Sequence, residues 1–229
     1  MNKNIINIGI PSKGRLKNDT LNIFKKKKLR IYSERGERDL FGYIKKSNVK
    51  IIYLHARECI EQLSLGNIDV GFSGIDLLKE SEINIQNKIN VLKKYSFGKA
   101  TLVVAVPDPW IDVQTVADLE EIAFDFKDKK KKRLRVATKY PNLTKDFLFS
   151  KGVTQFRLVN SLGATEAYPF TGSSEIITDI TSTGETLKAN NLRILKDGEI
   201  LKSEACMMVS KSSIKKINLK KIIKLLSKN

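Results

Sequence analysis

The sequence TDITSTGETL, from Thr178 to Leu187, is the stretch around which the rest of the chain is organised. Ile176 and Ile177 precede it and predict the end of a buried strand. The polar run from Thr181 to Gly184 leads into a segment that can begin a helix. Backbone N–H groups at a helix start, hydroxyl donors and a glycine that lets the backbone approach closely all favour an anion. The stretch therefore predicts a phosphate-binding loop, and an ordinary helix N-cap is the alternative.

The 229 residues have the composition of a globular protein with a large basic excess. Hydrophobic residues make up 41% and charged residues 29%, which provides enough apolar material for a packed core. The net charge of +17 is compatible with nucleic-acid binding. However, the lysine clusters are short and no aromatic residue interleaves with them to form a stacking platform for bases. We expect no nucleic-acid partner, and we assign part of the charge to an anionic small substrate.

The sequence lacks the patterns of a secreted or membrane-spanning protein. The apolar run from Ile5 to Pro11 is short and interrupted by Asn7 and Gly9, which predicts a first strand and not a signal peptide. No stretch approaches the roughly 20 apolar residues that span a bilayer. We therefore expect a cytoplasmic protein with no membrane partner, in which Cys59 and Cys206 are reduced thiols with packing roles.

Strand and helix patterns alternate through the first hundred residues, which is typical of a parallel α/β sheet. The near-continuous apolar run from Val49 to Leu54 indicates a strand covered on both faces. Loops that follow strands in such sheets form the binding crevice, so we expect residues 12–15, 55–58 and 73–76 to line it. The expected strands are residues 5–11, 29–32, 49–54 and 68–72, and the expected helices are residues 17–28, 58–65 (capped by Gly66) and 75–79.

The part of the chain after Phe97 predicts a second α/β unit. A turn is expected at Lys196-Asp197-Gly198. Residues 214–226 place isoleucine and leucine between lysines, which indicates an amphipathic helix that packs on the first domain; binding to a membrane surface is the alternative. The other expected strands are residues 100–106, 134–137, 156–159, 175–180 and 205–209, and the other expected helices are residues 117–122 and 144–150.

Five sequence motifs follow one another in a fixed order. They are Lys13-Gly14-Arg15-Leu16, the segment from Gly66 to Asp76 (GNIDVGFSGID), Phe97-Gly98-Lys99, the segment from Ala137 to Asn142 (ATKYPN), and a long signature made of Glu166, Gly172, Asp179 and the TGETL of residues 183–187. A single STG would be weak evidence, whereas ordered matches across most of the chain are specific. By these residues the chain resembles the ATP phosphoribosyltransferase family, which catalyses the first step of histidine biosynthesis.

The resemblance implies two α/β domains with a cleft between them, a fold of the periplasmic-binding-protein-like type II. Domain I would comprise residues 1–95 and 195–229 on the ATP and pyrophosphate side. Domain II would comprise residues 96–194, with the loop for the 5-phosphate of phosphoribosyl pyrophosphate (PRPP). The implied reaction converts ATP and PRPP to N1-(5-phosphoribosyl)-ATP and pyrophosphate with Mg²⁺, whose protein ligands stay unassigned. A non-catalytic cytoplasmic ligand-binding module of the same fold is the alternative.

The resemblance also assigns site residues. N1 of adenine carries no proton to remove, so no general base is expected, and the candidates for a direct role at the departing pyrophosphate are Arg15, His55 and Arg57. Glu166 is a candidate to line the cleft. The implied PRPP-binding residues are Asp179, Thr181, Ser182, Thr183, Gly184, Glu185, Thr186 and Leu187, and the implied ATP- or pyrophosphate-binding residues are Lys13, Gly14, Arg15, Arg38, Gly74 and Tyr140.

The chain departs from the family pattern on the pyrophosphate side. His55 stands where relatives often carry Arg, and Glu58 follows three residues later. Either His55 or Arg57 takes the place of that Arg, or this chain works differently at that position. The regulatory domain that long-form members append has no counterpart in these 229 residues, which resembles the short form. The short form implies a homodimer and a hetero-oligomer with a regulatory subunit related to histidyl-tRNA synthetases.

Overall fold

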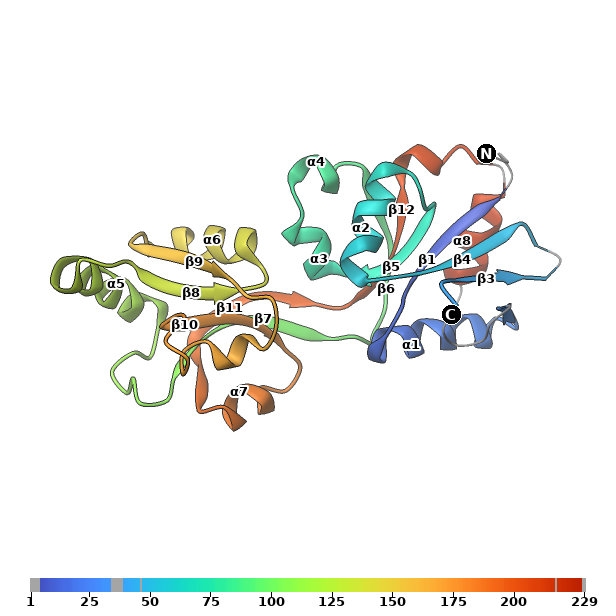
Figure 1. Ribbon diagram of the computed structural model, residues 1–229. Helices are drawn as coiled ribbons and strands as arrows, with labels where there is room; N and C mark the ends of the chain where they lie inside the picture. Colours follow the sequence, from blue (N-terminus) through green and yellow to red (C-terminus); the bar gives the residue numbers. More distant parts are fainter. Residues whose placement is uncertain (1–4, 34–38, 46, 217, 228–229) are drawn as a thin grey trace. The chain divides into compact units, whose positions relative to one another are not determined.

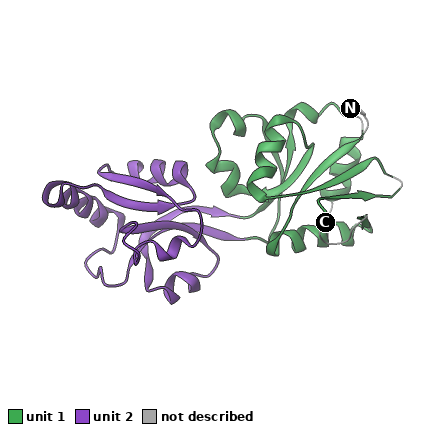
Figure 2. Ribbon diagram, viewed as in Figure 1, with its two compact units in different colours: residues 1–98, 204–229 green, residues 99–203 purple. Residues whose placement is uncertain are grey.

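The computed structural model describes residues 5–33, 39–45, 47–216 and 218–227. The chain divides into two units: unit 1 comprises residues 1–98 and 204–229, and unit 2 comprises residues 99–203 (Figure 2). We expected the divisions after residues 95 and 194. The second division lies later because strand β11 (Leu192–Ser203) pairs with β7 (Ala100–Pro107) as far as Ser203 opposite Ala100, which keeps the whole strand in unit 2.

Unit 1 contains a mixed sheet and not the purely parallel one that its sequence pattern predicts. Its strands are β1 (Ile6–Pro11), β2 (Ile31–Tyr32), β3 (Phe41–Ile44), β4 (Val49–Leu54), β5 (Val70–Gly74), β6 (Ile89–Lys94) and β12 (Ala205–Ser210). Their order is β2-β3-β4-β1-β5-β12-β6 (Figure 1). β1 runs parallel to both β4 and β5, whereas the pairs further out are antiparallel. β12 belongs to the C-terminal part of the chain and inserts between β5 and β6.

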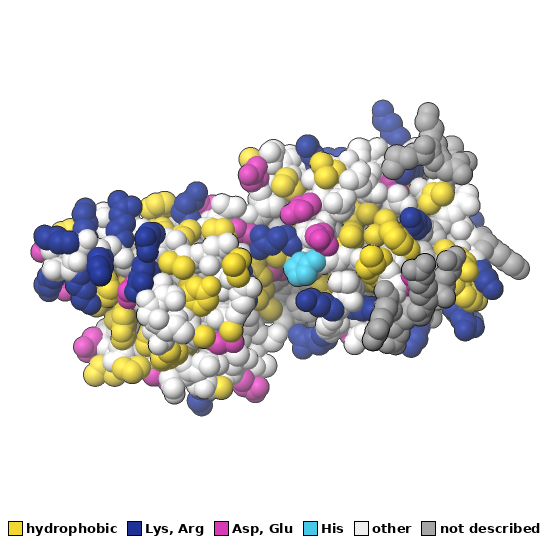
Figure 3. Space-filling model, in the orientation of Figure 1, with side chains coloured by type: hydrophobic (Ala, Val, Ile, Leu, Met, Phe, Trp, Pro, Cys, Tyr) yellow, Lys and Arg dark blue, Asp and Glu magenta, His cyan; other side chains and the backbone are white. Residues whose placement is uncertain are grey.

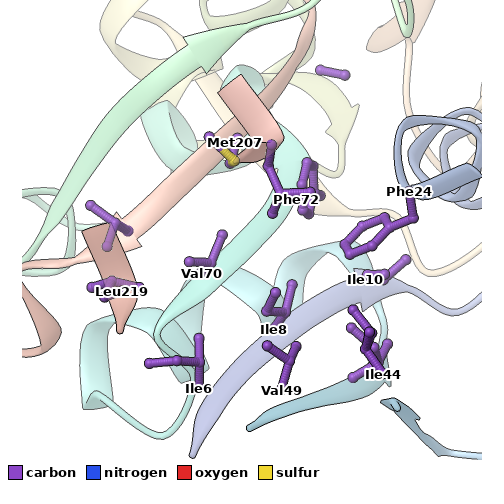
Figure 4. Packing of buried hydrophobic residues seen from close by; sticks show 14 of the residues in the cluster. Ile6, Ile8, Ile10, Phe24, Ile44, Val49, Val70, Phe72, Met207 and Leu219 are labelled. Atoms are coloured by element: carbon purple, nitrogen blue, oxygen red, sulfur yellow. The ribbon is translucent and has the colours of Figure 1, made fainter. Parts of the chain in front are cut away.

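Helices cover both faces of this sheet (Figure 1). They are α1 (Gly14–Lys26), α2 (Ala56–Leu65), α3 (Ile75–Glu80), α4 (Ile83–Gln86) and α8 (Leu219–Ser227), with the 3-10 helix η3 (Lys211–Ser213) before α8. Phe24 of α1 and Leu219 of α8 pack with Met207 in one buried cluster (Figure 4). Ile60 of α2 packs with Met208 in another cluster. Because neighbouring residues of β12 enter different clusters, that strand is buried on both faces.

Unit 2 is built around a second mixed sheet with the order β11-β7-β10-β8-β9. The strands not yet named are β8 (Leu134–Thr138), β9 (Phe156–Asn160) and β10 (Ile176–Thr181), and the helices are α5 (Val116–Lys130), α6 (Pro141–Ser150), η2 (Thr165–Ala167) and α7 (Glu185–Ala189). β8 runs parallel to β9 and β10, while β7 is antiparallel to β10 and β11. Leu119 of α5 and Leu148 of α6 share one buried cluster, whereas Leu187 of α7 belongs to another.

Several elements differ from the sequence expectations. Helix α5 continues to Lys130 instead of ending near residue 122. Ala123 is buried and Phe126 is half-buried, so the helical spacing of apolar residues that begins at Val116 extends past residue 122, and an exposed end at residues 127–130 follows. The turn expected at residues 196–198 is an irregularity within the long strand β11. Helix α8 begins at Leu219 and not at residue 214, and it packs on unit 1 as expected. Lys50 in β4 is exposed, so that strand is not covered along its full length on both faces.

Candidate functional site

Three predicted loops of unit 1 meet at one edge of its sheet. β4, β1 and β5 are parallel neighbours, so their carboxyl ends lie side by side. The N–H of Ser12 donates to the carbonyl oxygen of Leu54 at 2.7 Å, and the Ser73 hydroxyl donates to the carbonyl oxygen of Ala56 at 2.8 Å. These bonds tie the ends of the three strands together, as the sheet topology requires.

The motif Lys13-Gly14-Arg15 lies at the start of α1 and not in a loop before it. Lys13 is the N-cap residue with an extended backbone, and Gly14 has φ 78°, a left-handed conformation that favours glycine. A Cβ at Gly14 would meet nothing within 4 Å, so the backbone conformation and not crowding requires glycine there. Lys13 and Arg15 are exposed in the first turn. Two cations therefore lie at the carboxyl edge of the sheet.

His55 is the N-cap residue of α2. Its backbone N–H donates to Glu58 Oε2 at 2.8 Å, and its Nδ1 accepts the N–H of Arg57 at 3.4 Å. This reciprocal arrangement is a capping box, and it explains why an acid follows His55 after three residues. The imidazole is exposed, cyan in Figure 3, and so is Arg57. The signal for the capping role was present in the sequence as the spacing of His55 and Glu58, although serine or threonine usually fills the first position.

The remaining predicted residues for ATP or pyrophosphate have different surroundings. Gly74 is the N-cap of α3 and is half-buried, close to the loops of unit 1 described above. Arg38 lies outside the described residues. Tyr140 belongs to unit 2, where it precedes α6, and its residue is only 6% exposed. Its N–H donates to the hydroxyl of Thr138 at 2.9 Å.

The polar loop of unit 2 follows the carboxyl end of β10. Thr181 Oγ1 accepts the N–H of Gly184 at 2.8 Å, and Thr183 Oγ1 accepts the N–H of Glu185 at 3.4 Å. The sequence predicted free backbone N–H groups at this helix start, so the structure corrects that expectation for two of them. Each hydroxyl that accepts an N–H keeps its own O–H as a donor. The loop therefore presents hydroxyl donors whose oxygens are held by the backbone.

The other loop residues differ in backbone conformation, hydrogen bonding and burial. Gly184 has φ 80°, which favours glycine at the position before α7. The Ser182 hydroxyl donates to the carbonyl oxygen of Lys99 at 3.2 Å, while Glu185 and Thr186 are exposed. Leu187 is 3% exposed and anchors α7 in the core. A cavity of about 320 Å³ opens beside the loop, lined by residues 181–184 together with Thr101, Val103, Ile194, Leu195, Lys196 and Glu199.

Asp179 lies in β10, two residues before Thr181, and the pKa of its carboxyl group is shifted. Burial raises the pKa of its carboxyl group, and so does the charge of Glu166. A hydrogen bond from the N–H of Ile180 at 2.8 Å and the charge of Lys139 lower this pKa. The net pKa is higher than that of an ordinary aspartate. Asp179, Lys139 and Glu166 thus interact electrostatically within unit 2. The sequence singled out Asp179 and Glu166, whereas Lys139 appeared only as part of the ATKYPN motif.

The raised pKa of Asp179 leads to a pH-dependent prediction for the variant Asp179→Asn. When the folded-state pKa lies above the unfolded value of about 3.8, the folded state holds more protons between the two values. Stability is therefore lost as pH rises through this window, and the ionised carboxylate destabilises the fold at neutral pH. We expect Asp179→Asn to raise Tm at pH 7.5, with the gain shrinking as pH falls toward 4.

Thermal unfolding followed by circular dichroism across this pH range measures the effect. The exposed residue Asp146 provides a matched control, because Asp146→Asn removes one carboxylate from the same unit without removing a buried charge. A Tm difference for Asp179→Asn that is the same at every pH would contradict the prediction.

Within residues 5–33, 39–45, 47–216 and 218–227, no group of three or more His, Cys, Asp or Glu side chains is arranged to hold a metal ion. Over the same part of the chain, no helix has both the length and the apolar character needed to cross a bilayer.

Comparison with known proteins identifies the family. The family model HisG, described as ATP phosphoribosyltransferase, matches residues 55–228. The ATP phosphoribosyltransferase of Nitrobacter winogradskyi is 44% identical over 90% of this chain, and the chain spans 64% of that relative's length. A solved structure from Thermotoga maritima, described as an ATP phosphoribosyl transferase (HisG:HisZ) complex, has 26% identity and a TM-score of 0.75, with 97% of this chain and 96% of that one covered.

A binding protein supports the fold class alone. The arginine-bound form of the arginine-binding protein ArgBP from Thermotoga maritima has 15% identity and a TM-score of 0.52, with 98% of this chain and 93% of that one covered. The expected α/β fold of the periplasmic-binding-protein-like type II is thereby confirmed. The family resemblance deduced from the ordered motifs is confirmed as well, since the family match includes all of them except the first. The chain belongs to the ATP phosphoribosyltransferase family.

Proposed function

We propose that this chain catalyses the reaction of ATP with PRPP to give N1-(5-phosphoribosyl)-ATP and pyrophosphate, the first step of histidine biosynthesis. The observation that carries the proposal is the hydroxyl-rich loop after β10, which lies within the family match and borders a cavity. N1 of adenine would attack the anomeric carbon of PRPP as pyrophosphate leaves. Such a reaction depends on positioning and charge stabilisation, because the attacking nitrogen has no proton to lose.

On the PRPP side, the proposal uses the loop and its flanking carboxylate. The hydroxyls of Thr181 and Thr183 are oriented by the N–H bonds that they accept, so their O–H groups can donate to the 5-phosphate. Asp179 would accept hydrogen bonds from ribose hydroxyls. Leu187 is buried, so its backbone and not its side chain would face a ligand. The proposed PRPP-binding residues are Asp179, Thr181, Ser182, Thr183, Gly184, Glu185, Thr186 and Leu187.

On the ATP and pyrophosphate side, the proposal uses the carboxyl edge of the unit 1 sheet. Lys13 and Arg15 are exposed cations at the start of α1, suited respectively to a point-charge contact and a bidentate contact with phosphate. Arg57 is an exposed cation at the start of α2. The Nδ1 atom of His55 is engaged in the helix cap, which leaves Nε2 as the ring nitrogen for substrate. Gly14, Gly74 and Arg38 complete the proposed set in unit 1, and Tyr140 of unit 2 is also proposed to bind ATP or pyrophosphate.

Mg²⁺ is proposed to accompany PRPP and pyrophosphate. This ion prefers oxygen donors and often uses one or two carboxylates together with substrate phosphates. Asp179 and Glu166 interact electrostatically and supply carboxylate oxygens near the loop, so the residues present fit the ion. When bound, Mg²⁺ would neutralise charge that develops on the departing pyrophosphate.

The proposal also includes the partner subunits of this chain and its location in the cell. The Thermotoga neighbour is described as a HisG:HisZ complex, which supports a hetero-oligomer of this chain with a HisZ-like subunit. We further propose that this subunit is the regulatory relative of histidyl-tRNA synthetases, that the catalytic chain forms homodimers and that the assembly is cytoplasmic. Light scattering of the chain alone and of the chain with such a subunit would test both assemblies.

The activity test mixes the purified chain with ATP, PRPP and Mg²⁺ and follows the absorbance of phosphoribosyl-ATP. We expect product formation that stops when a chelator removes the metal and resumes when Mg²⁺ is restored. The same reactions are repeated with a HisZ-like subunit. Absence of product in every combination would contradict the proposal, and ligand binding without product would favour the non-catalytic binding module of the same fold.

A further inference from the structure

Three buried threonine hydroxyls form a closed ring inside unit 2. Thr138 is the last residue of β8, Thr144 lies in α6 and Thr178 lies in β10, and all three residues are 0% exposed. The oxygen of Thr178 is 2.6 Å from that of Thr138 and 2.6 Å from that of Thr144. The oxygens of Thr138 and Thr144 are 3.1 Å apart. We refer to these residues as the threonine ring.

The direction of every hydrogen bond in the threonine ring follows from counting protons. Each hydroxyl has a single proton to donate. Thr178 donates to Thr138, so Thr144 must donate to Thr178, and Thr138 is left to donate to Thr144. The Thr138 oxygen also accepts the N–H of Tyr140 at 2.9 Å. All three protons are used, and a fully satisfied buried network of this kind rigidifies its surroundings.

The threonine ring joins the strand ends that carry proposed site residues. Thr178 is the residue before Asp179, and Thr138 is the residue before Lys139. The two threonines lie opposite each other in the parallel ladder of β8 and β10. A shift of this ladder by one residue would turn Thr178 away from Thr138 and move Asp179 to the other face of the sheet. The hydroxyl contacts therefore penalise such a shift, whereas three valines of similar shape would be less selective.

We propose that the threonine ring is a positioning device for PRPP binding, which holds Asp179 and Lys139 in their working places at the ends of β10 and β8. This inference rests on the proposed function, because it takes the β10 end as the PRPP site. Two features of the surroundings support it. The ring also fixes the first turn of α6, since Tyr140 donates its N–H to Thr138 and accepts the N–H of Thr144 at 2.9 Å. Lys139 and Asp179 interact electrostatically, so a relative displacement changes the charge balance at the loop.

The variant Thr178→Val tests the inference, because it removes one hydroxyl and preserves the side-chain shape. We expect the KM for PRPP to rise about tenfold or more, since small displacements of positioned groups are costly, and to rise more than the KM for ATP, whose proposed ligand Tyr140 contacts the ring through its backbone. Thr178→Ser keeps the hydroxyl and should restore the KM for PRPP.

The control and the second variant separate positioning from general stability. Thr20→Val removes a hydroxyl that is equally buried in α1 of unit 1, where it donates to the carbonyl oxygen of Leu16 at 2.7 Å. This control should leave the KM for PRPP unchanged. Thr144→Val opens the same ring from α6, and it replaces Thr178→Val if that variant fails to fold.

The outcomes distinguish the inference from the function on which it rests. A wild-type chain that forms no product and binds no PRPP in calorimetry would overturn the proposed function and the role of the threonine ring together. A wild-type chain that binds PRPP, with folded Thr178→Val and Thr144→Val variants of equal PRPP affinity, would overturn the role of the ring alone. A selective loss of PRPP affinity that serine restores would support the inference.

Discussion

The variant Asp69→Ala is expected to lower the free energy of unfolding of unit 1 by about 3 kcal/mol or more. Asp69 is 1% exposed, and its carboxylate accepts the N–H of Asn7 at 2.8 Å and the hydroxyl of Ser213 at 2.5 Å. Lys216 completes the set with an ion pair of 2.8 Å. Removing the carboxylate leaves buried donors without acceptors and releases the segment that leads into α8.

Urea unfolding with spectroscopic detection measures the loss in free energy of unfolding, and two further variants are compared with Asp69→Ala. Asp69→Asn retains an oxygen that can accept the N–H of Asn7 but loses the ion pair, so its cost should be intermediate. Glu61→Ala removes an exposed carboxylate from α2 of the same unit and should change stability by no more than about 0.5 kcal/mol. If Asp69→Ala unfolded at the urea concentration of the wild type, the structural role of this carboxylate would be refuted.

The second large effect concerns the double variant Thr183→Ala with Thr186→Ala in the polar loop. We expect it to weaken PRPP binding by roughly 100-fold and to leave ATP binding nearly unchanged. Each hydroxyl that donates to a phosphate is worth about 1.5–3 kcal/mol, and about 1.4 kcal/mol corresponds to a factor of ten. Thr183 contributes a further effect, because its oxygen also accepts the N–H of Glu185.

Calorimetric titration of the double variant with PRPP and with ATP gives both affinities. The double variant Ser150→Ala with Thr154→Ala serves as the control, since it removes two exposed hydroxyls in the same unit, one at the last residue of α6 and one in the segment before β9. Equal losses for PRPP and ATP would mean that the loop is not the PRPP site.

Prediction of the strands from sequence succeeded where an apolar run ended at clear turn residues. Val49–Leu54 was predicted with its observed bounds as β4, and β10 was predicted to within one residue at each end. β3 was missed because its exposed positions are Phe41 and Tyr43, so hydrophobicity does not alternate along it. β6 was missed because its apolar residues Val91 and Leu92 are exposed, so hydrophobicity does not distinguish the buried face of this strand from its exposed face.

Prediction of the candidate site succeeded for local motifs and failed for their contacts. The motifs identified the family, and the segments of residues 12–15, 55–58 and 73–76, which were predicted as loops and contain helix starts, do meet at one sheet edge. The capping role of His55 and the electrostatic partnership of Lys139 with Asp179 were not predicted. The assignments of individual residues to ATP and PRPP remain predictions, which the loop variants can test.

The sequence by itself determined the local features of this protein: the polar, glycine-containing composition of residues 178–187, the glycine cap at Gly66 after α2, the alternation of strands and helices, and the family. The tertiary structure alone decided how β12 inserts between β5 and β6, how Asp69 holds Ser213 and Lys216, and how the threonine ring closes. The physical reason is the separation along the chain of the residues that make contact. Periodicity and turn chemistry report on neighbouring residues, whereas Ser213 lies 144 residues from Asp69 and Thr178 lies 40 residues from Thr138, and only chain folding brings such groups together.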